Sequence, residues 1–338
     1  MNLEQRITAF VKLGQRITTI SKSDLEILCD QTAQKNPWFT APNVKLALDG
    51  ISKFLSEDKL RGWTSNKEYS LEPIKAKQVG VAMAGNIPLA GFHDFLSVLI
   101  AGHKLNAKLS SQDSVLITFL SEILQQEEPR FTALISFQER LNGVDAVIAT
   151  GSDNTSRYFE YYFRNIPHII RKNRSSCAVI MGEEDASQLT NLGNDVFSYF
   201  GLGCRNVAKL FVPEQYSFIP LLDQWEGYKE VGNHHKYANN YDYQKSILLV
   251  NQIPFFDNGF VLLTENENLV SPISTLFFEN YKNLDDLYSK LSQQKDKIQC
   301  ITSANAWLKD SVQFGQAQYP EVWNYADNVD TLKFLSGI

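Results

Sequence analysis

One cysteine of this sequence stands where a thiol could act as a nucleophile. Cys204 follows Gly201 and Gly203 and precedes Arg205. Glycines let the backbone approach a ligand closely, and a neighbouring guanidinium favours the thiolate, the reactive form of cysteine. Taken alone, these neighbours favour a plainer interpretation slightly more: a small buried residue beside a tight turn.

Two polar residues follow apolar segments and could contact a ligand. Asn86 lies in Gly85-Asn86-Ile87-Pro88. Asparagine at such a place is commonly a turn former, although its amide could instead donate a hydrogen bond to an oxyanion. Lys108 could extend harmlessly into solvent, or it could reach a phosphate or a ribose.

Apolar segments alternate with helical ones along most of the chain, which is typical of βαβ units and a parallel sheet covered on both faces. The expected strands are 78–83, 105–109, 145–150, 177–181, 207–212, 247–250, 261–263, 275–278 and 298–302. Parallel sheets bind ligands where a strand leads into the next helix. Asn86, Lys108 and Gly151-Ser152 stand at three such junctions, and no GxGxxG motif is present.

The remaining segments complete the expected organisation. Residues up to about 75 have an amphipathic helical pattern, with 61–73 as a polar connection. Asp113 or Ser114 can cap a helix that runs to Gln126, and another helix should cover 186–200. The polar stretch 232–243 predicts a long loop. Two α/β domains, the second starting near residue 180, fit this pattern best.

Composition excludes several classes of protein. The 338 residues suffice for about two domains. A net charge of −6 without a basic block argues against non-specific nucleic-acid binding. The N-terminus has no apolar region behind a positive start, so we expect no secretory signal. The longest apolar stretch, 95–101, is far shorter than the roughly 18 residues of a membrane helix.

The other cysteines and the histidines give no sign of a metal site. Cys29, Cys177 and Cys300 lie inside apolar patterns and are expected to be buried. No CxxC pair is present, and His234-His235 lacks the spacing of a helical metal pair. We therefore expect no metal, no disulfide framework, and reduced thiols in the cytoplasm.

The order of these features resembles the aldehyde dehydrogenase superfamily. Gly85-Asn86-Ile87-Pro88 is similar to its Asn-Phe-Pro turn, and the segment ending at Lys108 to its Gly-Asn…Lys segment. Gly151-Ser152 resembles the Gly-Ser before the cofactor-binding helix, and Gly201-Leu202-Gly203-Cys204 the Gly-Gln-x-Cys nucleophile motif. The resemblance covers residues from about 78 to 280. The short length, Ser110-Ser111-Gln112-Asp113-Ser114 and Gly203-Cys204-Arg205-Asn206-Val207 most resemble the acyl-CoA reductase branch, the LuxC-like fatty-acyl reductases.

The resemblance implies an α/β fold with two parallel-sheet domains and a cysteine at the cleft between them. An N-terminal helical segment (1–75) would pack on a Rossmann-type NAD(P)-binding domain (76–178), followed by a catalytic domain (179–305) and a C-terminal segment (306–338). Cys204 would be the nucleophile and Asn86 an oxyanion donor. Lys108, Ser110, Ser111, Gly151 and Ser152 would bind the cofactor.

Three departures from the superfamily bear on the chemistry. Arg171-Lys172-Asn173-Arg174 aligns with the Glu-Leu-Gly-Gly segment whose glutamate activates water, so that glutamate is missing. Ser111 replaces the acidic residue that would hold the adenine ribose, which favours NADPH over NADH, with NADH still possible. Asn268 and Val270 replace the Glu and Phe of E-I-F-G-P, so nicotinamide-ribose binding must differ.

The resemblance implies NADPH-dependent reduction of an acyl thioester to aldehyde through a covalent Cys204 acyl-enzyme. The expected thioester is an acyl-CoA with a fatty acyl group. Two alternatives stay open: an aldehyde oxidoreductase that makes acids, and a catalytically silent binding subunit for an acyl-transfer partner. The acyl donor could be CoA, a carrier protein or a partner enzyme. A homo-oligomer is possible, and no nucleic acid or membrane partner is expected.

Overall fold

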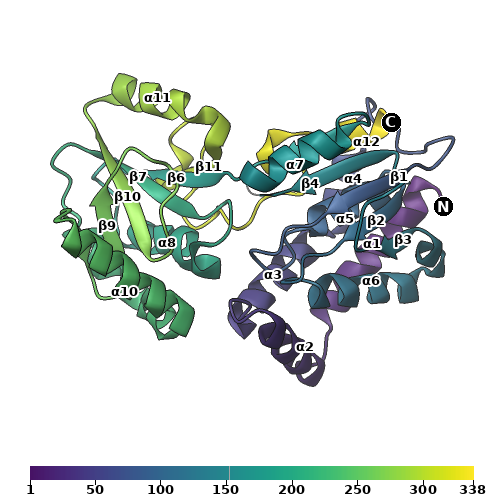
Figure 1. Cartoon of the computed structure of the whole chain (residues 1–338), viewed down its shortest axis with the longest axis horizontal. Helices are drawn as coiled ribbons and strands as arrows, with labels where there is room; N and C mark the ends of the chain where they lie inside the picture. The colour runs from purple at the N-terminus through teal and green to yellow at the C-terminus, as the bar shows by residue number, and fades with distance from the viewer. Residues whose placement is uncertain (152) are drawn as a thin grey trace. The chain divides into compact units, whose positions relative to one another are not determined.

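The chain folds into two compact units, each with its own sheet (Figure 1). The computed structural model describes residues 1–151 and 153–338. The first unit comprises Met1–Asn173 and Glu321–Ile338, and the second comprises Arg174–Pro320. The expected boundary after residue 178 therefore falls inside a strand of the second unit, and the expected C-terminal segment 306–338 is divided between the two units.

The first unit is built on a five-stranded parallel sheet in the order β3-β2-β1-β4-β5. Its strands are β1 (Gln78–Ala82), β2 (Lys104–Lys108), β3 (Ile135–Phe137), β4 (Ala146–Thr150) and β5 (His168–Arg171). The chain runs outward from β1 to β3 and then returns to β4 on the other side of β1. This reversal is the topological switch point at which α/β sheets bind ligands beyond the carboxyl ends of the strands.

Helices surround this sheet. They are α1 (Leu3–Thr18), α2 (Lys22–Lys35), α3 (Ala41–Phe54), α4 (Glu57–Thr64), α5 (Phe92–Ile100), α6 (Val115–Glu127), α7 (Asp153–Phe163) and α12 (Thr331–Ser336), with short 3-10 helices η1 (Pro129–Ala133) and η6 (Ala326–Asn328). The N-terminal helix α1 packs against α3, α4, α5 and α6. Its buried side is mostly apolar, with Phe10 and Leu13 fully enclosed, and it also includes Arg6.

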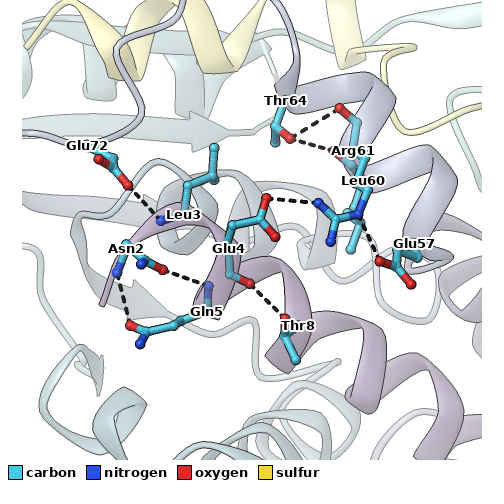
Figure 2. Close-up of polar contacts among 10 residues, drawn as sticks. All are labelled: Asn2, Leu3, Glu4, Gln5, Thr8, Glu57, Leu60, Arg61, Thr64 and Glu72. Carbon is cyan, nitrogen blue, oxygen red and sulfur yellow. Dashed lines mark hydrogen bonds and ion pairs between the residues drawn. The ribbon is translucent and has the colours of Figure 1, made fainter.

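Polar contacts fix the start of α1 against α4 (Figure 2). The Asn2 side chain accepts the Gln5 N–H at 2.9 Å and the Gln5 side chain accepts the Asn2 N–H at 3.2 Å, a capping box. Arg61 of α4 donates to Glu4 of α1 and to Glu57, each at 2.8 Å.

The expected polar connection 61–73 is wrong over residues 61–64, because these residues belong to the helix α4.

The second unit contains a seven-stranded sheet in the order β12-β11-β6-β7-β10-β9-β8, in which only the β8–β9 pair is antiparallel. Its strands are β6 (Ser175–Val179), β7 (Val207–Pro213), β8 (Phe256–Asp257), β9 (Leu262–Glu265), β10 (Thr275–Tyr281), β11 (Ile298–Ser303) and β12 (Val312–Gln313). Strand β6 is buried throughout, and its apolar residues Cys177, Ala178 and Val179 continue into buried Ile180.

The helices of the second unit are α8 (Ala186–Phe197), α9 (Ile219–Gln224), α10 (His235–Val250) and α11 (Leu284–Gln293), with 3-10 helices η2 (Ser198–Gly201), η3 (Trp225–Asn233), η4 (Lys295–Lys297) and η5 (Ala304–Ala306). One core cluster gathers α8, α9 and β7 around fully buried Trp225. A second cluster packs α11 against β6 and β11. Within the described residues, none of the helices combines the length and apolar content that crossing a bilayer requires.

Two predictions in the second unit are wrong. The expected loop 232–243 and the expected strand 247–250 together form η3 and the long helix α10. The run Ile247-Leu248-Leu249-Val250 resembles a buried strand because periodicity cannot separate a short apolar strand from the end of a helix. Only Tyr237 and Leu248 of α10 are buried, so the helix has almost no apolar stripe that could reveal it.

Candidate active site

Three of the predicted ligand-binding segments lie along one edge of the first sheet. Asn86 follows β1, Lys108 ends β2 and Gly151 follows β4, and these three strands are neighbours. The Met83 N–H donates to the Lys108 carbonyl at 3.0 Å, so β1 and β2 stay paired up to this edge. Asn86 and Lys108 are exposed. The topology therefore brings both residues to the carboxyl end of the sheet, where α/β sheets commonly bind ligands.

The turns after β1 and β2 are in close contact. A Cβ on Gly85 would lie 2.3 Å from the Ser110 Oγ and 2.6 Å from its Cβ, so no side chain fits at position 85. Ser110 is half-buried, whereas Ser111 is exposed. The requirement for glycine beside Asn86 thus comes from the approach of the Ser110 turn.

A buried carboxylate links the same two turns. The Asp113 Oδ2 accepts the Leu89 N–H at 2.6 Å, and Leu89 has the left-handed φ of 61°. Asp113 is only 3% exposed, and burial raises its pKa to about 7. The sequence suggests Asp113 or Ser114 as a helix cap, but Ser114 is the N-cap residue and makes no side-chain cap bond. The hydrogen bond between Asp113 and Leu89 cannot be predicted from the local sequence.

Gly151 follows β4 and precedes α7 in sequence. Its N–H donates to the Arg171 carbonyl at 3.3 Å, and a Cβ there would lie 2.9 Å from the Cβ of Thr155. The predicted cofactor residue Ser152 lies outside the described residues. The N-terminus of a helix such as α7 provides N–H groups and a dipole that suit a phosphate.

Cys204 lies in the second unit, on the connection from α8 to β7, as the sequence predicts. In η2, Tyr199 and Phe200 have left-handed φ angles of 51° and 57°, and Gly201 has a φ of 77°. Three consecutive residues in this sparsely populated region are unusual, and such strain is often found at functional sites. The Ser176 Oγ of β6 donates to the Cys204 carbonyl at 3.0 Å, which ties the turn to the neighbouring strand.

Asn206 holds the interior of the Cys204 turn. Its Oδ1 accepts the Gly203 N–H at 2.8 Å, while its Nδ2 donates to the carbonyls of Asp195 at 3.0 Å and Ser198 at 2.8 Å. Asn206 is 1% exposed, so these bonds are shielded from water. A single side chain therefore fixes the end of α8 and the turn that carries Cys204.

Arg205 binds a segment of the second unit that is distant in sequence. Its Nε donates to the Ala317 carbonyl at 2.5 Å, and its Nη2 lies 3.5 Å from the Cys300 Sγ. Asp195 accepts the Gly315 and Ala317 N–H groups at 2.7 and 2.9 Å, and burial raises its pKa to about 7. The segment 315–317 is thus bound from both sides, and sequence reasoning missed this role of Asp195.

The four cysteines, all within the described part of the chain, differ sharply in exposure. Cys204 is exposed, while Cys29, Cys177 and Cys300 are buried, which confirms the prediction for these three. Burial raises the pKa of each buried thiol. Cys204 is therefore the thiol best placed to react. Among the described residues, no three His, Cys, Asp or Glu side chains are grouped to hold a metal ion.

Arg171, the first residue of the segment aligned with the water-activating glutamate, has a structural role. It ends β5 and forms a buried ion pair with Asp94 of α5. Its Nη2 also donates to the Thr331 Oγ1 of α12 at 2.9 Å. This guanidinium therefore holds three elements of the first unit together.

Comparisons with known proteins show the fold. The aldehyde dehydrogenase of Bacillus cereus in complex with NAD+ is 12% identical, with 90% of this chain and 72% of that chain covered and a TM-score of 0.63. An NAD-dependent aldehyde dehydrogenase from Sinorhizobium meliloti is 10% identical, with 92% and 72% covered and a TM-score of 0.67. A mutant aldehyde dehydrogenase C from Pseudomonas syringae, in complex with NAD+ and octanal, is 10% identical, with 90% and 72% covered and a TM-score of 0.63.

The chain therefore has the aldehyde dehydrogenase fold, as predicted. No family model matches the sequence, and no curated protein matches it. The structural relatives are aldehyde dehydrogenases in general, so they do not distinguish the acyl-CoA reductase branch from the rest of that fold group.

Proposed function

We propose that this protein is an oxidoreductase that reduces an acyl thioester to an aldehyde through a covalent intermediate on Cys204. The observation that carries the proposal is the exposure of Cys204 on a strained turn, where the other three thiols are buried. A thiolate here attacks the thioester carbonyl; the Sγ–carbon bond forms, and the bond from carbon to the CoA sulfur breaks as CoA leaves. The Asn86 amide stabilises the oxyanion.

The residues at the edge of the first sheet fit a dinucleotide. Lys108, Ser110 and Ser111 would hold the adenosine ribose and its substituent, and Gly151 with the start of α7 would hold the phosphates. An exposed lysine without an acidic residue at position 111 favours NADPH. When bound, the nicotinamide supplies the hydride that reduces the acyl group.

The proposal favours reduction over acid formation because a water-activating carboxylate is missing. Arg171 is committed to Asp94 and Thr331. Without a carboxylate that activates water, the acyl-enzyme is hydrolysed slowly and persists long enough to be reduced. Octanal in the Pseudomonas syringae complex is a medium-chain aldehyde, which is compatible with a fatty acyl substrate here. Delivery of the acyl group by a carrier protein or an acyl-transfer partner would serve the same chemistry.

Product analysis tests this proposal. Purified protein is incubated with short-, medium- and long-chain acyl-CoAs and with NADPH or NADH, and aldehyde and free CoA are quantified. We expect equal amounts of both, faster turnover with NADPH, and no turnover by Cys204→Ala. Cys29→Ala, which removes a buried thiol of the first unit, serves as the matched control and should retain activity.

Two results would contradict the proposal. Turnover by Cys204→Ala would remove the nucleophile assignment. Acid formed from aldehyde and NADP+ without CoA, at a rate above that of reduction, would identify the protein as an acid-forming oxidoreductase instead.

A further inference from the structure

We infer that Asp113 is a positioning residue for Asn86: its buried carboxylate fixes the backbone of Leu89 and so holds the Asn86 loop (residues 83–91) against the turn after β2. This inference rests on the function proposed above for Asn86. Asp113 would act on Asn86 through the loop backbone, by way of its bond to Leu89.

The bond to Leu89 holds a conformation that the residue does not favour. A branched side chain at a φ of 61° is strained, so the surrounding structure must maintain it. The Asp113 Oδ2 does so by accepting the Leu89 N–H at 2.6 Å. Since Leu89 is only three residues from Asn86, its conformation sets the path of the loop.

The same turn contacts the loop on the other side of Asn86. Gly85 packs against the Ser110 Oγ so closely that a Cβ would lie 2.3 Å from it. The Asp113 N–H donates to the Ser110 carbonyl at 3.1 Å, so the two contacts belong to one rigid turn. Asn86 is thus exposed between two fixed points, at positions 85 and 89.

The environment of Asp113 is unfavourable for a carboxylate. It is 3% exposed, and its Oδ1 has no hydrogen-bond partner among the described residues. Burial raises its pKa to about 7, and the Leu89 N–H is what opposes that rise. A buried carboxyl with a single N–H donor costs folding free energy, and groups with such perturbed pKa values cluster at functional sites.

The first part of the test measures the loop without any activity. Amide hydrogen exchange is followed by mass spectrometry in the wild type, Asp113→Ala and Asp113→Asn. We expect Asp113→Ala to speed exchange in peptides covering 83–91 by about tenfold or more. Asp113→Asn retains an oxygen acceptor for the Leu89 N–H and should restore protection.

The control is Asp145→Ala, which removes a carboxylate that accepts the Gln78 N–H at 2.7 Å at the amino end of the same sheet. It should leave peptides 83–91 unchanged. Unchanged exchange of 83–91 in Asp113→Ala would overturn the inference, whatever reaction the protein catalyses.

The second part measures whether Asp113 acts through Asn86. Acylation of Cys204 by p-nitrophenyl acetate is followed as release of p-nitrophenolate, which needs neither CoA nor nicotinamide. Asp113→Ala should slow acylation by about tenfold when Asn86 is present and by less than about twofold in Asn86→Ala, since coupled residues are non-additive. Asp113→Asn should acylate near the wild-type rate.

Equal effects of Asp113→Ala in both backgrounds would assign it a structural role only and overturn the inference. An enzyme that is acylated normally but forms no aldehyde from acyl-CoA would instead contradict the proposed function and leave the positioning role of Asp113 supported.

Discussion

An amide side chain stabilises an oxyanion only where it is held in a fixed direction. Asn86 is exposed at the carboxyl end of β1, and its loop is fixed on one side by the Gly85–Ser110 contact and on the other by the Asp113–Leu89 bond. The backbone on both sides of Asn86 is thus held in place, which supports the role of oxyanion donor that we propose for this residue.

We predict that Asn86→Ala lowers the kcat of aldehyde formation by about 10²–10³-fold, with a small change in KM, because the lost bond is made mainly to the oxyanion. Steady-state kinetics with a saturating acyl-CoA measure it. Asn106→Ala is the control, since this asparagine of β2 bonds to the Gln78 side chain at 3.0 Å. A loss below tenfold would argue against an oxyanion role for Asn86.

At the residue scale, the sequence indicates which residues could react better than it indicates where a long side chain points. The neighbours of Cys204 indicate a candidate nucleophile, and the apolar patterns around the other three cysteines predict that they are buried. The sequence places Arg205 beside the thiol, yet the guanidinium bonds to the Ala317 carbonyl and contacts Cys300. Adjacency in sequence does not fix where a long side chain points, because distant segments such as 315–317 supply its partners.

At the scale of elements, the predicted site depends on two turns that fit together. The strands β1 and β4 are predictable because they are mostly buried and apolar, and β2 because buried Leu105 and Ala107 alternate with polar residues. The junctions after these strands follow from the parallel topology. The contact between the turns is not predictable, since it depends on how far β1 and β2 extend. The helix α10 is not predictable either, because it is largely exposed and lacks a periodic apolar face.

We predict that Gly85→Ala destabilises the protein by about 1–3 kcal/mol, because the new methyl group overlaps Ser110. Urea unfolding of the variant measures this change. Adding Gly85→Ala to Ser110→Gly, which removes the obstructing atoms, should cost clearly less than adding it to the wild type.

The matched control for this experiment is Gly50→Ala in α3, where a Cβ meets nothing within 4 Å. Alanine is the better helix former there, so a gain of about 0.5–1 kcal/mol is expected. If Gly85→Ala proves as harmless as Gly50→Ala, the two turns are not in the contact described.

At the scale of the whole molecule, the C-terminal segment of the chain returns to the unit in which the chain begins. Residues 321–338 belong to the first unit, where the His93 Nε2 is 2.7 Å from the Val322 carbonyl and the Trp63 Nε1 donates to the Tyr325 hydroxyl at 2.7 Å. The sequence shows two α/β domains but gives no sign of this return, because contacts across more than two hundred residues leave no local pattern. The fold group is nevertheless predictable from the order of a few short motifs.

The central claim is that Cys204 carries the acyl group, and intact-protein mass spectrometry tests it most directly. The protein is mixed with a panel of acyl-CoAs without nicotinamide, and the modified peptide is mapped. We predict an acyl adduct on Cys204 that disappears, with release of aldehyde, when NADPH is added. An adduct on another residue, or an adduct on Cys204 that NADPH leaves unchanged, would contradict the proposed mechanism.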